Sequence, residues 1–141
     1  MATVNLYSRG GAIYVAASDG VVDLEPIEVV RDRGALGPAI ERALDLAGRT
    51  PWAPRNLREY KWPVLRAAGI KSAVQFERGV KFLMLECADG GKCTIQRYLP
   101  DVAHGRGFDP GDILFAGVAV SAGDLASHVL ESFDRSDWCV R

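Results

Sequence analysis

The side chains best suited to chemistry are two histidines and three cysteines, and their spacing matches no common metal or catalytic motif. His104 lies in a glycine-rich stretch, and His128 precedes Val129 on a predicted helix. Neither histidine belongs to an HxH or HExxH pattern, and no two cysteines form CxxC. We therefore expect no metal ion and no cofactor.

Cys87 and Cys93 flank the turn Asp89-Gly90-Gly91, which predicts that they lie on neighbouring strands of a hairpin. A disulfide between them is geometrically conceivable there. Buried free thiols are the interpretation we favour, because three cysteines are an odd number and the sequence shows no other feature of a secreted protein. We expect a reduced, cytoplasmic protein.

Other catalytic signatures are also missing from the sequence. No serine stands in a GxSxG motif, and no GxxxxGK[ST] or GxGxxG loop follows a strand. Asp101, Asp109 and Asp112 lie close in sequence but lack the spacing of a calcium loop, which favours turn and solvation roles for them. The sequence predicts that the protein is not an enzyme.

Charge is balanced overall but unevenly distributed, with 17 basic and 18 acidic residues giving a net charge of -1. Residues 49–71 combine an excess of basic side chains with three aromatic ones: Arg49, Arg55, Arg58, Lys61, Arg66 and Lys71, with Trp52, Tyr60 and Trp62. Such a segment can bind nucleic acid. We favour the alternative that its aromatic residues anchor an irregular segment to the core.

Residues 101–137 have the opposite character, because acidic residues outnumber basic ones there. An acidic surface can steer the approach of a basic protein. Scattered surface charge is the plainer explanation.

The expected elements alternate strands with a few helices. Extended patterns cover residues 4–7, 12–16, 27–30, 73–76, 80–86, 93–98 and 113–120. Helical patterns cover residues 36–47, 63–68 and 122–133, and residues 100–111 resemble a long surface loop. The run 113–120 is apolar at every position, which is typical of a central strand.

These elements predict an α/β protein of the α+β type. A mostly antiparallel central sheet would be flanked by two to three helices in a single domain, residues 1–141. A strand, turn and helix at residues 26–46 are echoed at 117–133, which suggests a structural pseudo-repeat. The N-terminus does not resemble a signal peptide, and no apolar run is long enough to span a bilayer.

Three segments resemble a known family when they are taken in order. Residues 34–44, GALGPAIERAL, resemble an "LGxAIxxAL" helix that follows a strand. Residues 62–79, with LRAAGIKS and FERG, resemble an "LxxAGVKSxxxFxKG" segment, and a terminal strand followed by Asp124-Leu125-Ala126 completes the pattern. Ala126 stands where a glycine is expected. The chain resembles the immunity proteins of bacterial contact-dependent growth inhibition systems over about residues 27–136.

The resemblance implies a cytoplasmic protein that binds and neutralises the C-terminal toxin domain, often a nuclease, of a contact-dependent growth inhibition effector. It implies no catalytic residues, no small-molecule substrate and no membrane association. From charge and expected exposure we predict a toxin-binding surface made by Asp101, His104, Asp109, Asp112, Glu131 and Asp134. The alternative function is nucleic-acid binding through residues 49–71.

Overall fold

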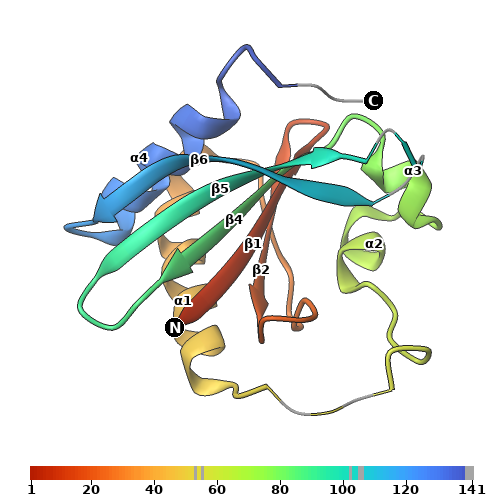
Figure 1. Ribbon diagram of the computed structural model, residues 1–141, viewed down its shortest axis with the longest axis horizontal. Coiled ribbons are helices and arrows are strands. Elements are labelled where there is room, and N and C mark those ends of the chain that lie inside the picture. The colour runs from red at the N-terminus through yellow and green to blue at the C-terminus, as the bar shows by residue number, and fades with distance from the viewer. Residues whose placement is uncertain (53, 55, 102, 105–106, 139–141) are drawn as a thin grey trace.

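One six-stranded antiparallel sheet runs through the computed structural model, which describes residues 1–141 except 53, 55, 102, 105–106 and 139–141 (Figure 1). The strand order is β3-β2-β1-β4-β5-β6. The strands are β1 (Ala2–Arg9), β2 (Ala12–Ser18), β3 (Glu28–Val30), β4 (Lys81–Cys87), β5 (Lys92–Pro100) and β6 (Phe108–Val118). The helices are α1 (Leu36–Arg49), α2 (Pro63–Ala68), α3 (Ala73–Glu77) and α4 (Ala122–Phe133), and a 3-10 turn at Arg33–Ala35 precedes α1. The predicted α+β fold is confirmed.

The strand order is symmetric about the middle of the sheet, because the chain repeats a unit of three strands and a helix. The first half is β1-β2-β3-α1 and the second half is β4-β5-β6-α4. β1 and β4 pair antiparallel in the middle of the sheet, and each half then extends outward. Both first hairpins turn on two glycines with positive φ, Gly10-Gly11 and Gly90-Gly91. The pseudo-repeat suggested by residues 26–46 and 117–133 therefore extends to each whole half.

The two long helices cover one face of the sheet. α1 and α4 lie side by side behind the sheet in Figure 1 and contact each other. The buried side of α1 carries the predicted stripe, with Leu36 and Ile40 fully buried, and α4 buries Leu125, Val129 and Phe133. Ser121 caps α4, since its hydroxyl accepts a hydrogen bond from the Asp124 N–H at 3.0 Å. Alternate residues of the strands meet these helices and form the larger core.

The opposite face is covered only in part, by the segment that joins the two halves. α2 and α3 lie over one end of this face, where Phe76 is fully buried against Tyr7, Tyr14 and Trp62. The helix predicted after Pro63 is confirmed, and Gly69 ends it in the left-handed conformation at φ 69°.

Three expectations about the elements are wrong. Residues 73–76 form α3 and not a strand, because the Ser72 hydroxyl caps a helical turn by accepting from the Gln75 N–H at 3.1 Å. The expected loop 100–111 is partly strand, since β5 continues to Pro100 and β6 begins at Phe108. Residues 113–118 lie in β6, which is an edge strand and not a central one.

Cys87 and Cys93 form a disulfide, which corrects the expectation of free thiols. They are directly opposite each other on β4 and β5, with their Cα atoms 4.2 Å apart. The predicted hairpin created this proximity. Cys139 lies outside the described residues.

None of the helices in the described part of the chain combines the length and hydropathy needed to traverse a bilayer.

Candidate protein-binding surface

The six residues predicted to bind a toxin lie on neighbouring parts of the second half. Asp101 and His104 lie in the connection between β5 and β6, and Asp109 and Asp112 lie on β6. Glu131 lies on α4, and Asp134 is the residue at its C-terminal cap. Each side chain has a different local environment, which determines what it can offer to a partner.

Asp101 and His104 form a local pair. The Asp101 carboxylate lies 2.6 Å from His104 Nδ1 and accepts a hydrogen bond from the His104 backbone N–H at 3.1 Å. That backbone bond, followed by the imidazole contact, holds the pKa of Asp101 below its ordinary value. The Asp101 side chain is 17% exposed and the His104 side chain 79%, so the histidine is the accessible member.

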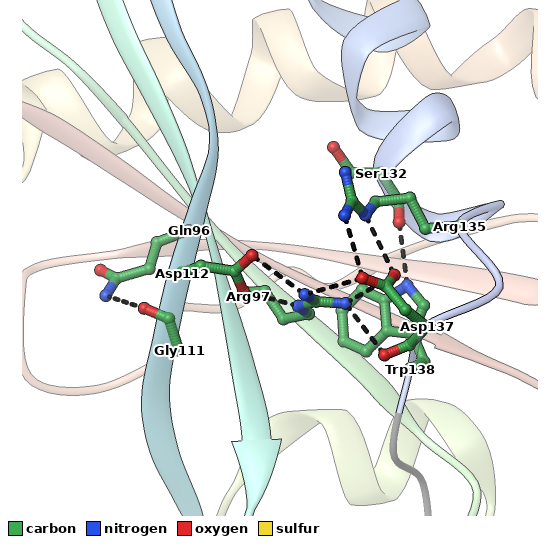
Figure 2. Close-up of polar contacts among 8 residues, drawn as sticks. All are labelled: Gln96, Arg97, Gly111, Asp112, Ser132, Arg135, Asp137 and Trp138. Carbon is green, nitrogen blue, oxygen red and sulfur yellow. Dashed lines mark hydrogen bonds and ion pairs between the residues drawn. The ribbon is translucent and has the colours of Figure 1, made fainter.

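Asp112 is held by a buried arginine of the adjacent strand (Figure 2). Arg97 donates from Nε to one Asp112 oxygen at 2.8 Å and from Nη2 to the other at 3.0 Å. The Arg97 side chain is only 7% exposed, whereas that of Asp112 is 53% exposed. These bonds lower the pKa of Asp112, so the carboxylate stays ionised and attached to β5.

The same guanidinium binds the segment that follows α4. Arg97 Nη1 donates to the Asp137 carboxylate at 3.0 Å and to its backbone carbonyl at 3.3 Å. Trp138 lies under the guanidinium at 5.3 Å from the ring centroid, and its indole N–H donates to the Ser132 carbonyl at 2.9 Å. Arg135 also binds Asp137, and together the two arginines hold the pKa of Asp137 well below its usual range. Arg97 therefore ties β6 and the end of α4 to β5.

Asp134 is engaged in an exposed ion pair with the start of the first helical segment. Its two oxygens accept from Arg33 Nη1 and Nη2 at 2.8 and 2.9 Å. The guanidinium lowers the pKa of Asp134. Since both side chains are more than half exposed, this carboxylate stays accessible to a partner but already has a counter-ion.

Glu131 and Asp109 are exposed. The Glu131 side chain is 81% exposed, with its nearest cationic contact to His128 Nδ1 at 3.7 Å. The His128 ring stacks on Phe115 with centroids 3.9 Å apart. Below Glu131, a cavity of about 340 Å³ opens between β6 and α4; its lining is Leu114, Phe115, His128, Glu131, Ser132 and Arg135.

Exposed apolar side chains accompany the acidic ones on β6 and just after it. Ile113 is 58% exposed, Val118 65% and Val120 88%. Ile113 is paired with Gln96 and Val118 with Lys92 in the β5–β6 register. Because Cys93 and Ile95 of β5 face the helices, Gln96 and Lys92 face the other way, as do Ile113 and Val118. They lie on the face of the sheet opposite α4.

Two aromatic residues of the segment 49–71, Tyr60 and Trp62, hold it to Asp23. Trp62 donates from its indole N–H to the Asp23 carboxylate at 2.7 Å, and the Asp23 N–H donates to the Tyr60 hydroxyl at 3.1 Å. Arg49 is paired with Asp45, and Arg66 lies 3.6 Å from Glu25. Trp52 is 57% exposed. Arg55 lies outside the described residues.

Two polar groups central to these arrangements were missed from the sequence. Arg97 could have been found from strand alternation, since it continues the inward series Cys93 and Ile95. Asp23 accepts hydrogen bonds from Asn5, Tyr7 and Trp62, and burial raises its pKa. Its position between Val22 and Leu24 was the available signal. Among the described residues, no three His, Cys, Asp or Glu side chains converge as metal ligands would.

Comparisons with known proteins show the fold and no more. No protein-family model matches the chain, and no curated protein matches it in sequence. Among solved structures it is similar to the "Protein of Unknown Function NMB0488 from Neisseria meningitidis". The TM-score is 0.66 at 11% sequence identity, over 92% of this chain and 91% of that one.

Proposed function

We propose that this protein is an immunity protein, which binds and neutralises the C-terminal toxin domain of a contact-dependent growth inhibition effector. The proposal begins from the resemblance of residues 27–136 to that family. The structural observation that supports it best is the surface of β6 and α4. Exposed apolar side chains lie there on one face of the edge strand β6, and on its other face an accessible carboxylate, that of Glu131, borders the cavity between β6 and α4.

This combination is suited to a protein partner. Contiguous exposed apolar groups with a polar rim are typical of interaction surfaces. Ile113 and Val118 supply apolar groups on one face of the β6 edge, Asp109 supplies a carboxylate on the first part of β6, and Glu131 supplies one on the α4 side of that edge. A partner with a basic surface would be attracted over several ångströms before contact, since the Debye length is about 8 Å at physiological salt.

Co-expression provides the direct test. An immunity gene should follow the gene of a very large secreted protein, so the probe is the C-terminal domain encoded immediately upstream. We expect co-expression of the present chain to restore the growth of cells that produce this domain, and the two to purify as a one-to-one complex. Continued growth arrest with a stably produced chain, and no complex, would overturn the proposal.

Charge reversal tests where the complex forms. Asp109→Lys and Glu131→Lys should each slow association about 5-fold at low salt, with a smaller effect at high salt. Glu41→Lys is the matched control, because it makes the same charge change on the exposed side of α1. Equal association rates for all three variants, measured by surface plasmon resonance, would remove Asp109 and Glu131 from the interface.

Nucleic-acid binding through residues 49–71 stays the alternative proposal. Trp62 and Tyr60 are bonded to Asp23, so this function would depend on the exposed residues Trp52, Arg58 and Lys61. A mobility-shift titration at low salt with RNA and single-stranded DNA tests it. Binding that weakens steeply with salt and is lost in Arg58→Ala/Lys61→Ala would favour this function.

A further inference from the structure

The two edges of the sheet differ in how they are protected against pairing with another strand. β3, at one edge, has only three residues, and Pro26 closely precedes it. Its Glu28 is bound by Arg42 of α1, with Nη2 2.7 Å from Oε1. Short length, charge and proline are the features by which natural sheets block their edges.

The other edge, β6, is protected along its first part only. Asp109, Pro110 and Asp112 lie there, and register shifts interrupt the pairing with β5 between Ile95 and Gln96 and between Gln96 and Tyr98. Bulges of this kind twist an edge away from a neighbour.

The second part of β6, from Phe115 to Val118, has none of these features. Residues 113–120, ILFAGVAV, include no charged residue and no proline. Phe115 to Val118 pair with Ile95 to Lys92 in unbroken register. This regular, exposed and apolar edge is the form of strand that pairs with another chain.

The hydrogen-bond alternation identifies the backbone groups that point outward. The Ala88 N–H bonds to the Lys92 carbonyl at 2.8 Å, so Lys92 turns its backbone groups toward the β4 side. In an antiparallel ladder this orientation alternates, and Cys93 therefore turns toward Gly117 on β6. The N–H groups of Ala116 and Val118 accordingly point away from β5, toward the free edge.

We propose that residues 115–118 of β6 dock an extended strand of the toxin domain, which continues the sheet. This inference rests on the proposed function and adds the mode of binding to it. A strand placed there would bond to the outward backbone groups of Ala116 and Val118. Its alternate side chains would lie on opposite faces of the sheet.

The charges beside β6 specify the chemistry of this strand. On one face it meets Ile113 and Val118, which calls for apolar side chains. On the other face it lies along α4, where Glu131 is exposed and Asp124 is one-third exposed. Lysine or arginine at the intervening positions would be complementary to these carboxylates. A second copy of β6 would supply apolar side chains but no basic ones, because FDPGDILFAGV contains no lysine or arginine.

Two substitutions on the edge and one matched control test this mode of binding. Val118→Lys places a charge on the docking edge, and Ala116→Pro removes an outward N–H without removing a bond to β5. Val29→Lys makes the same change as the first variant, on an exposed valine of the opposite edge strand β3. The probe is the C-terminal domain encoded upstream, obtained from the co-expressed complex, and affinity is measured by isothermal titration calorimetry.

We expect Val118→Lys and Ala116→Pro to weaken binding about 10-fold or more, and Val29→Lys to leave it within about 2-fold of the original. Amide exchange of the unsubstituted protein should slow at Ala116 and Val118 in the complex. Melting curves of the free variants confirm that each is folded.

The contrary results separate the two proposals. Unchanged affinity in both edge variants, with no slowing of exchange at Ala116 and Val118, overturns strand docking and leaves the proposed function intact. Failure of the unsubstituted protein to bind or protect overturns the proposed function and strand docking with it. A dimer of the unsubstituted protein that becomes monomeric in Val118→Lys would assign the edge to a second copy, which also overturns the proposal.

Discussion

The two halves of the sheet share one topology but use their polar groups differently. In the first half, Asp23 is 6% exposed and accepts hydrogen bonds from Asn5, Tyr7 and Trp62. In the second half, Arg97 is equally buried but binds Asp112 and Asp137, which are half exposed. We call these groups the first centre, around Asp23, and the second centre, around Arg97. The first centre holds the segment that joins the two halves, whereas the second holds elements at the solvent-exposed edge.

The two copies of the repeated unit differ in how their edges and faces are covered. The connection between the halves supplies Trp62 and Phe76, which cover one end of the free face. The outer strand of the first half is short and bound to α1, whereas β6 is long and carries exposed apolar side chains. The edge of the first half is therefore covered by contacts within the chain, and the second half carries the surface that we propose binds a partner.

The largest expected effect is loss of the first centre. Asp23→Ala removes the acceptor of three side-chain hydrogen bonds and leaves buried donors without it. We expect the free energy of unfolding to fall by about 4 kcal/mol, measured by urea denaturation. Asp45→Ala, an exposed carboxylate on α1, should cost at most about 0.5 kcal/mol. Similar losses in the two variants would contradict the assigned role of Asp23.

Removal of the second centre should affect stability less and partner binding more. Arg97→Met keeps an unbranched side chain but removes the guanidinium that binds Asp112 and Asp137, two carboxylates that already reach solvent. We expect a loss of about 2 kcal/mol in unfolding free energy. The proposed toxin binding should also weaken, because Arg97 no longer connects β6 with the segment that follows α4. Unaltered binding at a temperature where the variant is folded would show that the contacts of Arg97 are not needed for partner binding.

The two centres should respond to acid in opposite directions. The pKa values of Asp112 and Asp137 lie below their ordinary 3.8, so their ionised forms stabilise the fold, and this contribution disappears as the pH falls below about 4. Burial raises the pKa of Asp23, so its protonated form is favoured in the folded protein. The stability that this form contributes is fully present below the unfolded pKa near 3.8 and is lost as the pH rises through the folded pKa.

Unfolding titrations between pH 3 and pH 7 check this contrast. The stability difference between the original protein and Arg97→Met should shrink below about pH 4. Asp23→Asn should flatten the dependence at higher pH, where the original protein loses stability as Asp23 ionises. A constant difference for Arg97→Met throughout the range would mean that the ion pairs add nothing to stability.

The smallest expected effect concerns the caps of the short and long helices. Ser72→Ala and Ser121→Ala each remove a hydroxyl that accepts one backbone N–H, from Gln75 and Asp124 respectively. Each should cost about 1 kcal/mol in thermal or urea unfolding. Since α4 borders the proposed binding surface and α3 does not, only Ser121→Ala should also weaken the proposed toxin binding. Equal effects on binding would contradict this distinction.

Much of the fold was predictable because local signals determine it. The stripe of Leu36, Ile40, Ala43 and Ala47 indicated α1, and Gly90-Gly91 indicated the β4–β5 hairpin. α3 was missed because five residues are too few to show helical periodicity, and Val74 and Phe76 favour strand. The run 113–120 looked central because composition does not reveal whether a strand has one neighbour or two.

The candidate surface was predictable only in part. The acidic character of the second half was visible in the sequence, but Asp112 and Asp134 are paired with Arg97 and Arg33, which are distant in sequence. Such pairs depend on strand order and helix placement, which local patterns do not encode. The same reason hid the contact of Trp62 with Asp23.

The central position of β1 has a consequence for synthesis of the chain. Ala2 pairs with Cys87 and Ser8 with Lys81, so β1 leaves the ribosome well before β4, the strand that bonds its second side. At about 5–20 residues per second, this interval lasts several seconds. During it, the β1–β2 hairpin exposes the hydrogen-bonding side that β4 will later cover. An unpaired strand side of this kind is open to pairing with another chain until β4 is made.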